Sequence, residues 1–121
     1  MPNYKTTAED FKIFQEEVDK WQKILGLLDW QIHTEQQKLN HRASCYTNHS
    51  GRIATLTLAV TWDNYGTPPG EQEIRRVAFH EICELLLAPL ILCAESRYVV
   101  AGDIDSCAHK IIRTLEHVLF E

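Results

Sequence analysis

Apolar and polar positions alternate with two different periods along this chain, and each period predicts one kind of element. From Phe11 to Leu28, apolar residues recur three and four positions apart, which is the spacing of an amphipathic helix. Thr6 or Thr7 can cap the start of this helix, and Gly26 is expected to close it. We expect a scaffold helix that packs on a sheet.

A period of two follows the first helix and predicts strands. Residues 29–36 alternate apolar and polar side chains, and the pattern allows a second strand over residues 43–47, followed by a turn at 48–51. Residues 53–62 carry the strongest strand pattern. One face of this strand is expected in the core: Ala54, Leu56, Leu58, Val60 and Trp62. Hairpin connections between these segments predict an antiparallel sheet.

The helical period returns after a loop rich in proline and glycine at residues 63–70. A central helix is expected to start near Glu71, with Pro89 kinking or ending it. A final helix can be capped by Asp103 or Asp105. The sequence therefore predicts one α+β domain over residues 1–121, with an N-terminal helix, a small antiparallel sheet, a central helix and a C-terminal helix.

The charge balance and the cysteine content indicate which binding partners and which cellular location to expect. The 121 residues include 12 basic and 17 acidic side chains, for a net charge of -5. This balance argues against binding to nucleic acid or to anionic membranes, which requires clustered Lys and Arg. The chain has no C-x-x-C pair, its N-terminus lacks the apolar core of a signal peptide, and its longest apolar run, 85–94, is too short to span a bilayer. We expect reduced thiols and a cytoplasmic location.

The candidate chemistry lies on the central helix, in the pattern His80-Glu81-x-x-Glu84. Residues four apart stand above one another on a helix, so His80 and Glu84 can converge on one ion while Glu81 reaches a water molecule. Zinc accepts nitrogen and oxygen ligands, and a catalytic zinc site keeps three protein ligands. On the final helix, His109 is the best third ligand and Glu116 is the alternative.

A second interpretation of the same residues involves no metal. In it, His80 is a hydrogen-bonded core histidine, Glu81 is solvated, and Glu84 pairs with Arg113. His-Glu-x-x-Glu arises by chance more often than the full His-Glu-x-x-His motif, so the pattern alone leaves both interpretations open. The histidines in or near the hairpin are expected at the surface rather than in a site: His33, His41 and His49.

Three segments together resemble the zincin-type metallopeptidases, in particular the small kind encoded in phages and prophages. They are residues 21–30 apart from position 28, residues 77–87 and residues 108–116, and they run over most of the chain in the expected order. The resemblance implies a zincin-like fold and a zinc site on the central helix. It also implies hydrolysis of peptide bonds by a metal-bound water, and a sheet edge that holds an extended peptide or protein substrate.

Carried over by position, the resemblance makes His80 the first ligand, Glu81 the general base and His109 the third ligand, with Glu116 behind it. Glu84 stands where zincins place their second histidine. Its carboxylate adds negative charge, which makes a bound metal a poorer Lewis acid. The resemblance implies zinc, but two histidines and one carboxylate also suit non-haem iron, so iron or manganese is the alternative. The competing function is a catalytically inactive zincin-like interaction or structural protein. A phage-encoded protein would act in the cytoplasm of the host cell.

Overall fold

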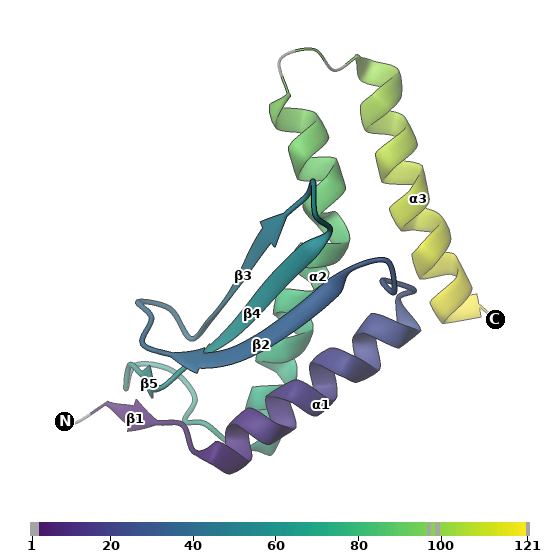
Figure 1. Cartoon of the computed structure of the whole chain (residues 1–121). Helices are drawn as coiled ribbons and strands as arrows, with labels where there is room; N and C mark the ends of the chain where they lie inside the picture. The colour runs from purple at the N-terminus through teal and green to yellow at the C-terminus, as the bar shows by residue number, and fades with distance from the viewer. Residues whose placement is uncertain (1–2, 97, 99, 121) are drawn as a thin grey trace.

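The structure is a computed structural model that describes residues 3–96, 98 and 100–120. Its elements are, in order, β1 (Tyr4–Lys5), α1 (Ala8–Ile24), β2 (Gln31–Gln37), β3 (Ala43–Asn48), β4 (Ile53–Ala59), β5 (Thr61–Trp62), α2 (Glu71–Glu95) and α3 (Ala101–Phe120). Figure 1 shows the three helices around a small sheet. The predicted α+β class is confirmed, as is the order of the main elements.

The main sheet has the strand order β2-β4-β3, which differs from the prediction. β3 and β4 form the expected antiparallel hairpin, but β2 pairs with β4 in parallel, from Gln31 opposite Ile53 to Gln37 opposite Ala59. The prediction of a wholly antiparallel sheet is therefore wrong. The reason is that β4 is the most apolar strand and lies at the centre, where it has a neighbour on each side. β2 and β4 run the same way because the chain reverses twice between them.

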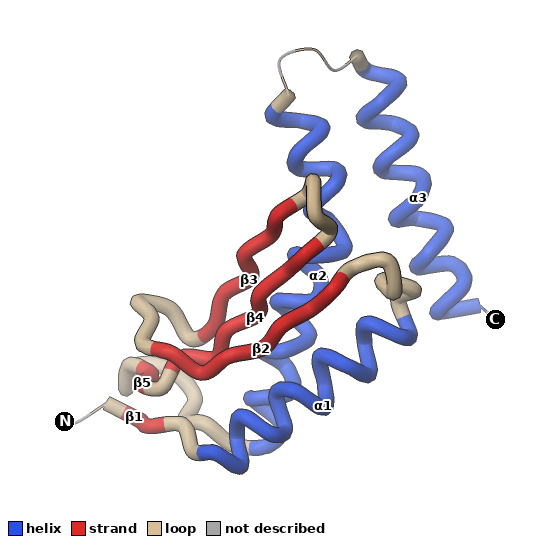
Figure 2. The backbone as a smooth tube through the Cα atoms, viewed as in Figure 1, coloured by secondary structure: helices blue, strands red, loops and turns tan. Residues whose placement is uncertain are grey.

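One face of the sheet is covered by helices, and the other is open (Figure 2). Leu56 and Leu58 of β4 are fully buried against Phe14 of α1 and Ile82 of α2, in one continuous apolar core. The predicted core face of this strand is confirmed except at Val60, which is only half-buried. The open face is polar.

The first helix begins and ends where the sequence predicts. Thr7 and Asp10 form a capping box, in which the Asp10 amide donates to Thr7 Oγ1 at 3.0 Å and the Thr7 amide donates to Asp10 Oδ2 at 2.9 Å. Gly26 follows the helix with φ of +67°, a conformation that a side chain disfavours. The helix is thus defined at both ends by local chemistry.

A buried carboxylate ties α1 to α2. Glu17 is 5% exposed and accepts hydrogen bonds from Trp21 Nε1 at 2.7 Å and from Arg75 Nη1 at 2.8 Å. Burial alone would raise the pKa of Glu17, but these two hydrogen bonds and the charges of Lys20 and Arg75 outweigh burial and lower it. Glu17 therefore stays ionised inside the interface between the two helices.

The predicted strand at 53–62 is broken into two. β4 ends at Ala59, and β5 pairs instead with β1 in a separate antiparallel sheet, with Trp62 opposite Tyr4. This pairing brings the start of the chain under the main sheet, where the Thr6 amide donates to the Val60 carbonyl at 3.0 Å. Two-residue strands carry too little pattern to be predicted.

The central helix starts at Glu71, as predicted, but it does not end at Pro89. It continues to Glu95, because an internal proline removes a single hydrogen bond from a helix that extends on both sides of it. α2 is long and apolar enough to cross a membrane, but core helices of soluble proteins can have the same length and composition. In this fold α2 contributes Ile74, Ile82 and Leu85 to the core.

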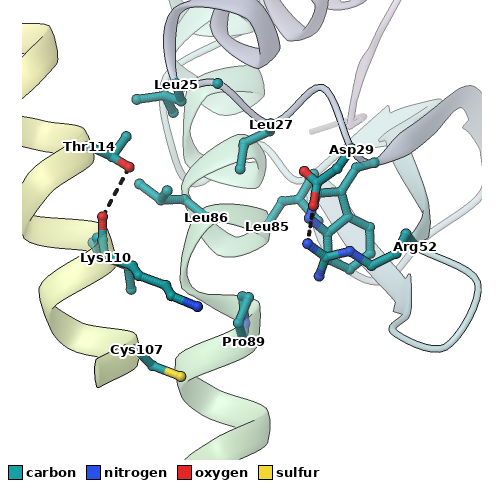
Figure 3. Close-up of a pocket in the computed structure, with 13 residues that line it drawn as sticks. Leu25, Leu27, Asp29, Arg52, Leu85, Leu86, Pro89, Cys107, Lys110 and Thr114 are labelled. Atoms are coloured by element: carbon teal, nitrogen blue, oxygen red, sulfur yellow. Dashed lines mark hydrogen bonds and ion pairs between the residues drawn. The ribbon is translucent and has the colours of Figure 1, made fainter. Parts of the chain in front are cut away.

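The last helix packs on the side of α2 that faces away from the sheet, and it has no buried residue. It begins at Ala101 rather than at Asp103 or Asp105. Asp103 lies inside its first turn, where Oδ2 accepts the Val100 amide at 3.2 Å. Between α3, α2 and the turn after α1 lies an apolar cavity of about 260 Å³ (Figure 3). Leu86 and Pro89 of α2 face Cys107 and Lys110 of α3 across it.

Candidate metal centre

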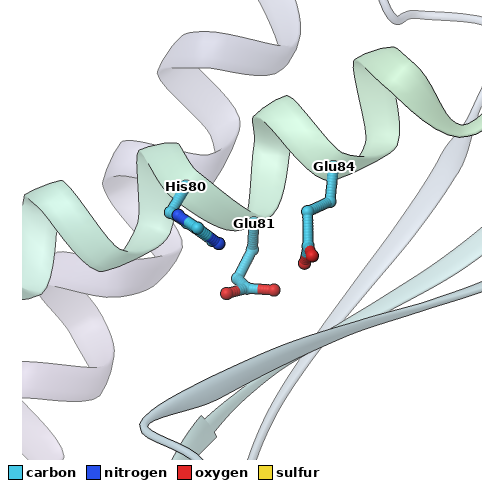
Figure 4. Close-up of side chains that lie close together, drawn as sticks. All are labelled: His80, Glu81 and Glu84. Atoms are coloured by element: carbon cyan, nitrogen blue, oxygen red, sulfur yellow. The ribbon is translucent and has the colours of Figure 1, made fainter.

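Three side chains on one side of α2 form a cluster with the composition of a metal site. A ring nitrogen of His80 and carboxylate oxygens of Glu81 and Glu84 all lie within 4.8 Å of one another. Figure 4 shows the three side chains pointing away from the helix toward the neighbouring strands. The spacing of one helical turn between His80 and Glu84 therefore produces the convergence that the sequence predicts.

Glu81 lies in the interior of this cluster. Its side chain is 5% exposed, whereas His80 and Glu84 are exposed. The Oε1 atom of Glu81 is buried and has no hydrogen-bond partner in the described part of the chain. Leaving a buried acceptor unpaired costs about 1–3 kcal/mol, and more for a charged group. The position therefore calls for a proton or a cation beside Glu81.

The electrostatics of the cluster lead to the same conclusion. Burial, a hydrogen bond with Glu84 and the negative charge of Glu84 together raise the pKa of Glu81 to about 8. Two carboxylates held this close repel one another unless a proton or a cation lies between them. A divalent ion would supply that positive charge and would also give the unpaired oxygen a partner.

The cluster opens into a groove between α2 and β3. His80, Glu81 and Glu84 line a hollow of about 450 Å³ together with four residues from β3 and the loop before it: His41, Ala43, Ser44 and Cys45. A second hollow of about 350 Å³ shares Cys45 and Glu84 and continues along α2 to Glu95. Among the described strands, β3 pairs with β4 alone, so its other edge is unpaired.

The structure does not bring His109 to the cluster. On α2, the residues that face α3 are Leu86 and Pro89, and position 86 is about 200° around the helix from position 84. His109 is exposed on α3, where its Nδ1 lies 2.8 Å from the carbonyl oxygen of Asp105. Glu116 is likewise exposed on α3. Neither of the two predicted third ligands is near His80, and no other observation tests their role.

The arrangement also differs from the interpretation without a metal. His80 is exposed rather than a core histidine, and Glu81 is buried rather than solvated. Among the described residues Glu84 forms no salt bridge with Arg113, which lies on α3. The interpretation without a metal does not explain why Glu81 Oε1 is buried with no hydrogen-bond partner among the described residues.

Two residues at the site, Cys45 and His41, were not predicted. Burial and the negative charges of Glu81 and Glu84 raise the pKa of Cys45 to about 12, so the isolated thiol stays protonated. The alternation of β3 puts Cys45 on the same face as Ala43 and Thr47. This signal is present in the sequence, but it does not say which strand lies beside α2. His33 is exposed, as expected, and His49 packs edge-on against Trp30.

No protein-family model, curated protein or solved structure matches this chain significantly. The zincin-type fold and family thus stay predictions, and the function is argued from the geometry of the cluster and its groove.

Proposed function

We propose that the protein is a metal-dependent peptidase that uses the cluster on α2. The observation that carries the proposal is the grouping of one imidazole and two carboxylates within 4.8 Å, with the buried Glu81 Oε1 unpaired. Acidic clusters are common on protein surfaces without any metal. A carboxylate that is buried, unpaired and directed into a hollow is much rarer.

The donor set fits zinc. His80 and Glu84 would hold the ion through nitrogen and oxygen, both of which zinc accepts. When bound, the ion supplies Lewis acidity that polarises a carbonyl group and makes water a better nucleophile. His80 and Glu84 are exposed, so a ligand in the groove can reach them.

Glu81 is the proton carrier in this proposal. Its carboxylate takes a proton from water as the water oxygen bonds to the peptide carbonyl carbon. It then returns the proton to the amide nitrogen as the carbon–nitrogen bond breaks, so that one water is consumed and a carboxylic acid and an amine are formed. A general base must be free of its proton before the reaction, and the positive charge of a bound ion would keep the Glu81 carboxylate ionised.

The groove favours an extended peptide as the substrate. The unpaired edge of β3 offers backbone donors and acceptors to an added strand, which is a common way for proteins to hold peptides. The far end of the groove is lined by Ala88, Ile91 and Leu92, which suit an apolar side chain of the substrate. The resemblance to zincin-type metallopeptidases favours the same substrate class.

The test is Glu81→Gln in protein purified without a histidine tag. We expect elemental analysis to find one zinc ion per chain in both wild type and variant, and peptide hydrolysis to be lost in the variant alone. His109→Ala is the matched control, and because His109 lies on α3 it should keep both metal and activity. Full activity in Glu81→Gln, or no metal in the wild type, would refute the proposal.

A catalytically inactive zincin-like protein is the second candidate, and Glu84 is the observation that favours it. A carboxylate ligand in place of an imidazole adds negative charge, which makes the ion a weaker Lewis acid. This candidate predicts one bound metal but no turnover of a diverse peptide library, and a biological role that Glu81→Gln leaves unchanged.

A further inference from the structure

The proposed metal site has two ligands on α2 and needs a third, and the structure shows from which side it must come. The face of α2 that carries His80 and Glu84 points toward β3 and away from α3. A third protein ligand therefore belongs to β3 or to the loop that precedes it. In this part of the hollow, the residues with ligating side chains are His41, Ser44 and Cys45.

Cys45 is the best placed of these three. It lines both hollows of the groove, and Glu84 is the one α2 residue that also lines both. Its thiol lies close enough to Glu81 and Glu84 for their negative charges to raise its pKa, although Sγ is outside the group of ligand atoms that lie within 4.8 Å of one another. His41 lies before β3, is exposed, and lines the first hollow alone. Ser44 offers a neutral hydroxyl, which is a weaker zinc ligand than a thiolate.

We propose that the Sγ atom of Cys45, as a thiolate, is the third protein ligand, so that the bound metal ties the edge strand β3 to α2. This inference rests on the proposed metal site at His80 and Glu84. A second observation supports a cation here: Glu81 lines the same hollow, and its buried Oε1 atom has no hydrogen-bond partner among the described residues.

The charges of this ligand set make a prediction about the metal. The Cys45 thiolate and the Glu84 carboxylate bring two negative charges as ligands and His80 contributes a neutral nitrogen, while the Glu81 carboxylate adds a third negative charge beside the ion. A soft sulfur ligand favours zinc over magnesium or manganese, which prefer oxygen. Coordination requires the thiol of Cys45 to lose its proton, so metal binding releases a proton to solution.

Cobalt substitution tests the inference directly. Cobalt(II) occupies zinc sites, and a cobalt–thiolate bond gives a strong near-ultraviolet charge-transfer absorption that nitrogen and oxygen ligands do not give. We expect this absorption in the wild type at one cobalt per chain, and its loss in Cys45→Ser. We also expect Cys45→Ser to weaken zinc affinity by more than about 100-fold, since even supporting residues around a metal typically account for 10–100-fold.

Two cysteines of the chain provide matched controls. Cys83 lies on α2 beside the cluster and Cys93 lies two turns and more beyond Glu84, and neither lines the hollow that holds His80. Cys83→Ser and Cys93→Ser should both keep the absorption. Circular dichroism and thermal unfolding of metal-free Cys45→Ser check that the fold is intact, and serine is close enough in size to preserve it.

The outcomes separate this inference from the proposed function. Cobalt bound without the sulfur absorption, or an absorption that persists in Cys45→Ser, would overturn the assignment of Cys45 and leave the metal site standing. A Cys45-dependent absorption without peptide hydrolysis would confirm Cys45 as a ligand and refute the peptidase. Failure of the wild type to bind either metal would overturn both.

Discussion

Replacing Glu81 by Gln should stabilise the metal-free protein at alkaline pH. Burial, the hydrogen bond with Glu84 and the charge of Glu84 raise the folded-state pKa of Glu81 from 4.5 to about 8. The folded protein therefore keeps a proton that the unfolded chain has lost, so stability falls as the pH rises from about 4.5 to about 8. A rise in pKa from 4.5 to about 8 corresponds to a loss of about 5 kcal/mol of stability at and above pH 8, and to none below pH 4.5.

The assay is urea denaturation with a metal chelator at several pH values between 4.5 and 8.5. The difference in unfolding free energy between variant and wild type should be near zero at the acidic end and rise by several kcal/mol toward the alkaline end. Taking the difference cancels the titration of the groups that do not interact with Glu81. Glu116→Gln, an exposed change on α3, should show no such rise. Parallel curves for Glu81→Gln and the wild type would refute the claim that burial and Glu84 raise the pKa of this carboxyl group.

Two further pairs of substitutions test the scaffold. Gly26→Ala should destabilise the protein by about 1 kcal/mol in urea denaturation, because Gly26 has φ of +67°. Gly102→Ala should stabilise it by about 0.5 kcal/mol, because Gly102 is helical and a Cβ there meets no atom within 4 Å. Arg75→Gln should cost about 3 kcal/mol at pH 7, since it leaves the Glu17 carboxylate buried without its guanidinium partner, and Arg76→Gln, on an exposed side chain, should cost less than about 1 kcal/mol. Equal effects within either pair would contradict the reasoning.

Local chemistry explains which parts of the fold could be predicted from the sequence. The ends of α1 follow from Thr7 and Gly26, whose roles depend only on their near neighbours. The core face of β4 follows from alternation, and the convergence of His80 and Glu84 follows from helix geometry. Each of these features is set within about one turn of helix or one strand.

The errors concern long-range arrangement. Nothing local to β2 shows that it pairs with β4 rather than β3, because that choice depends on which strand is most apolar overall. The prediction of a third ligand on the last helix rests on the chemistry of His109 alone. The sequence does not show on which side of α2 the last helix packs, and in the structure Leu86 and Pro89 of α2 face α3. The alternation of β3 gives the face on which Cys45 lies, but only the long-range packing of β3 beside α2 brings Cys45 into the same hollow as Glu84.

The strand order also has a consequence for how the chain assembles. β3 and β4 are joined by a short turn and need only each other, so their ladder can form locally within microseconds. β2 pairs only with β4 among the described strands, and β4 begins 16 residues after β2 ends. The partner of β2 is therefore distant in the sequence, whereas the partner of β3 is the next strand along the chain. We expect the wall of the groove to form faster than the far edge of the sheet, because local pairings close a shorter loop.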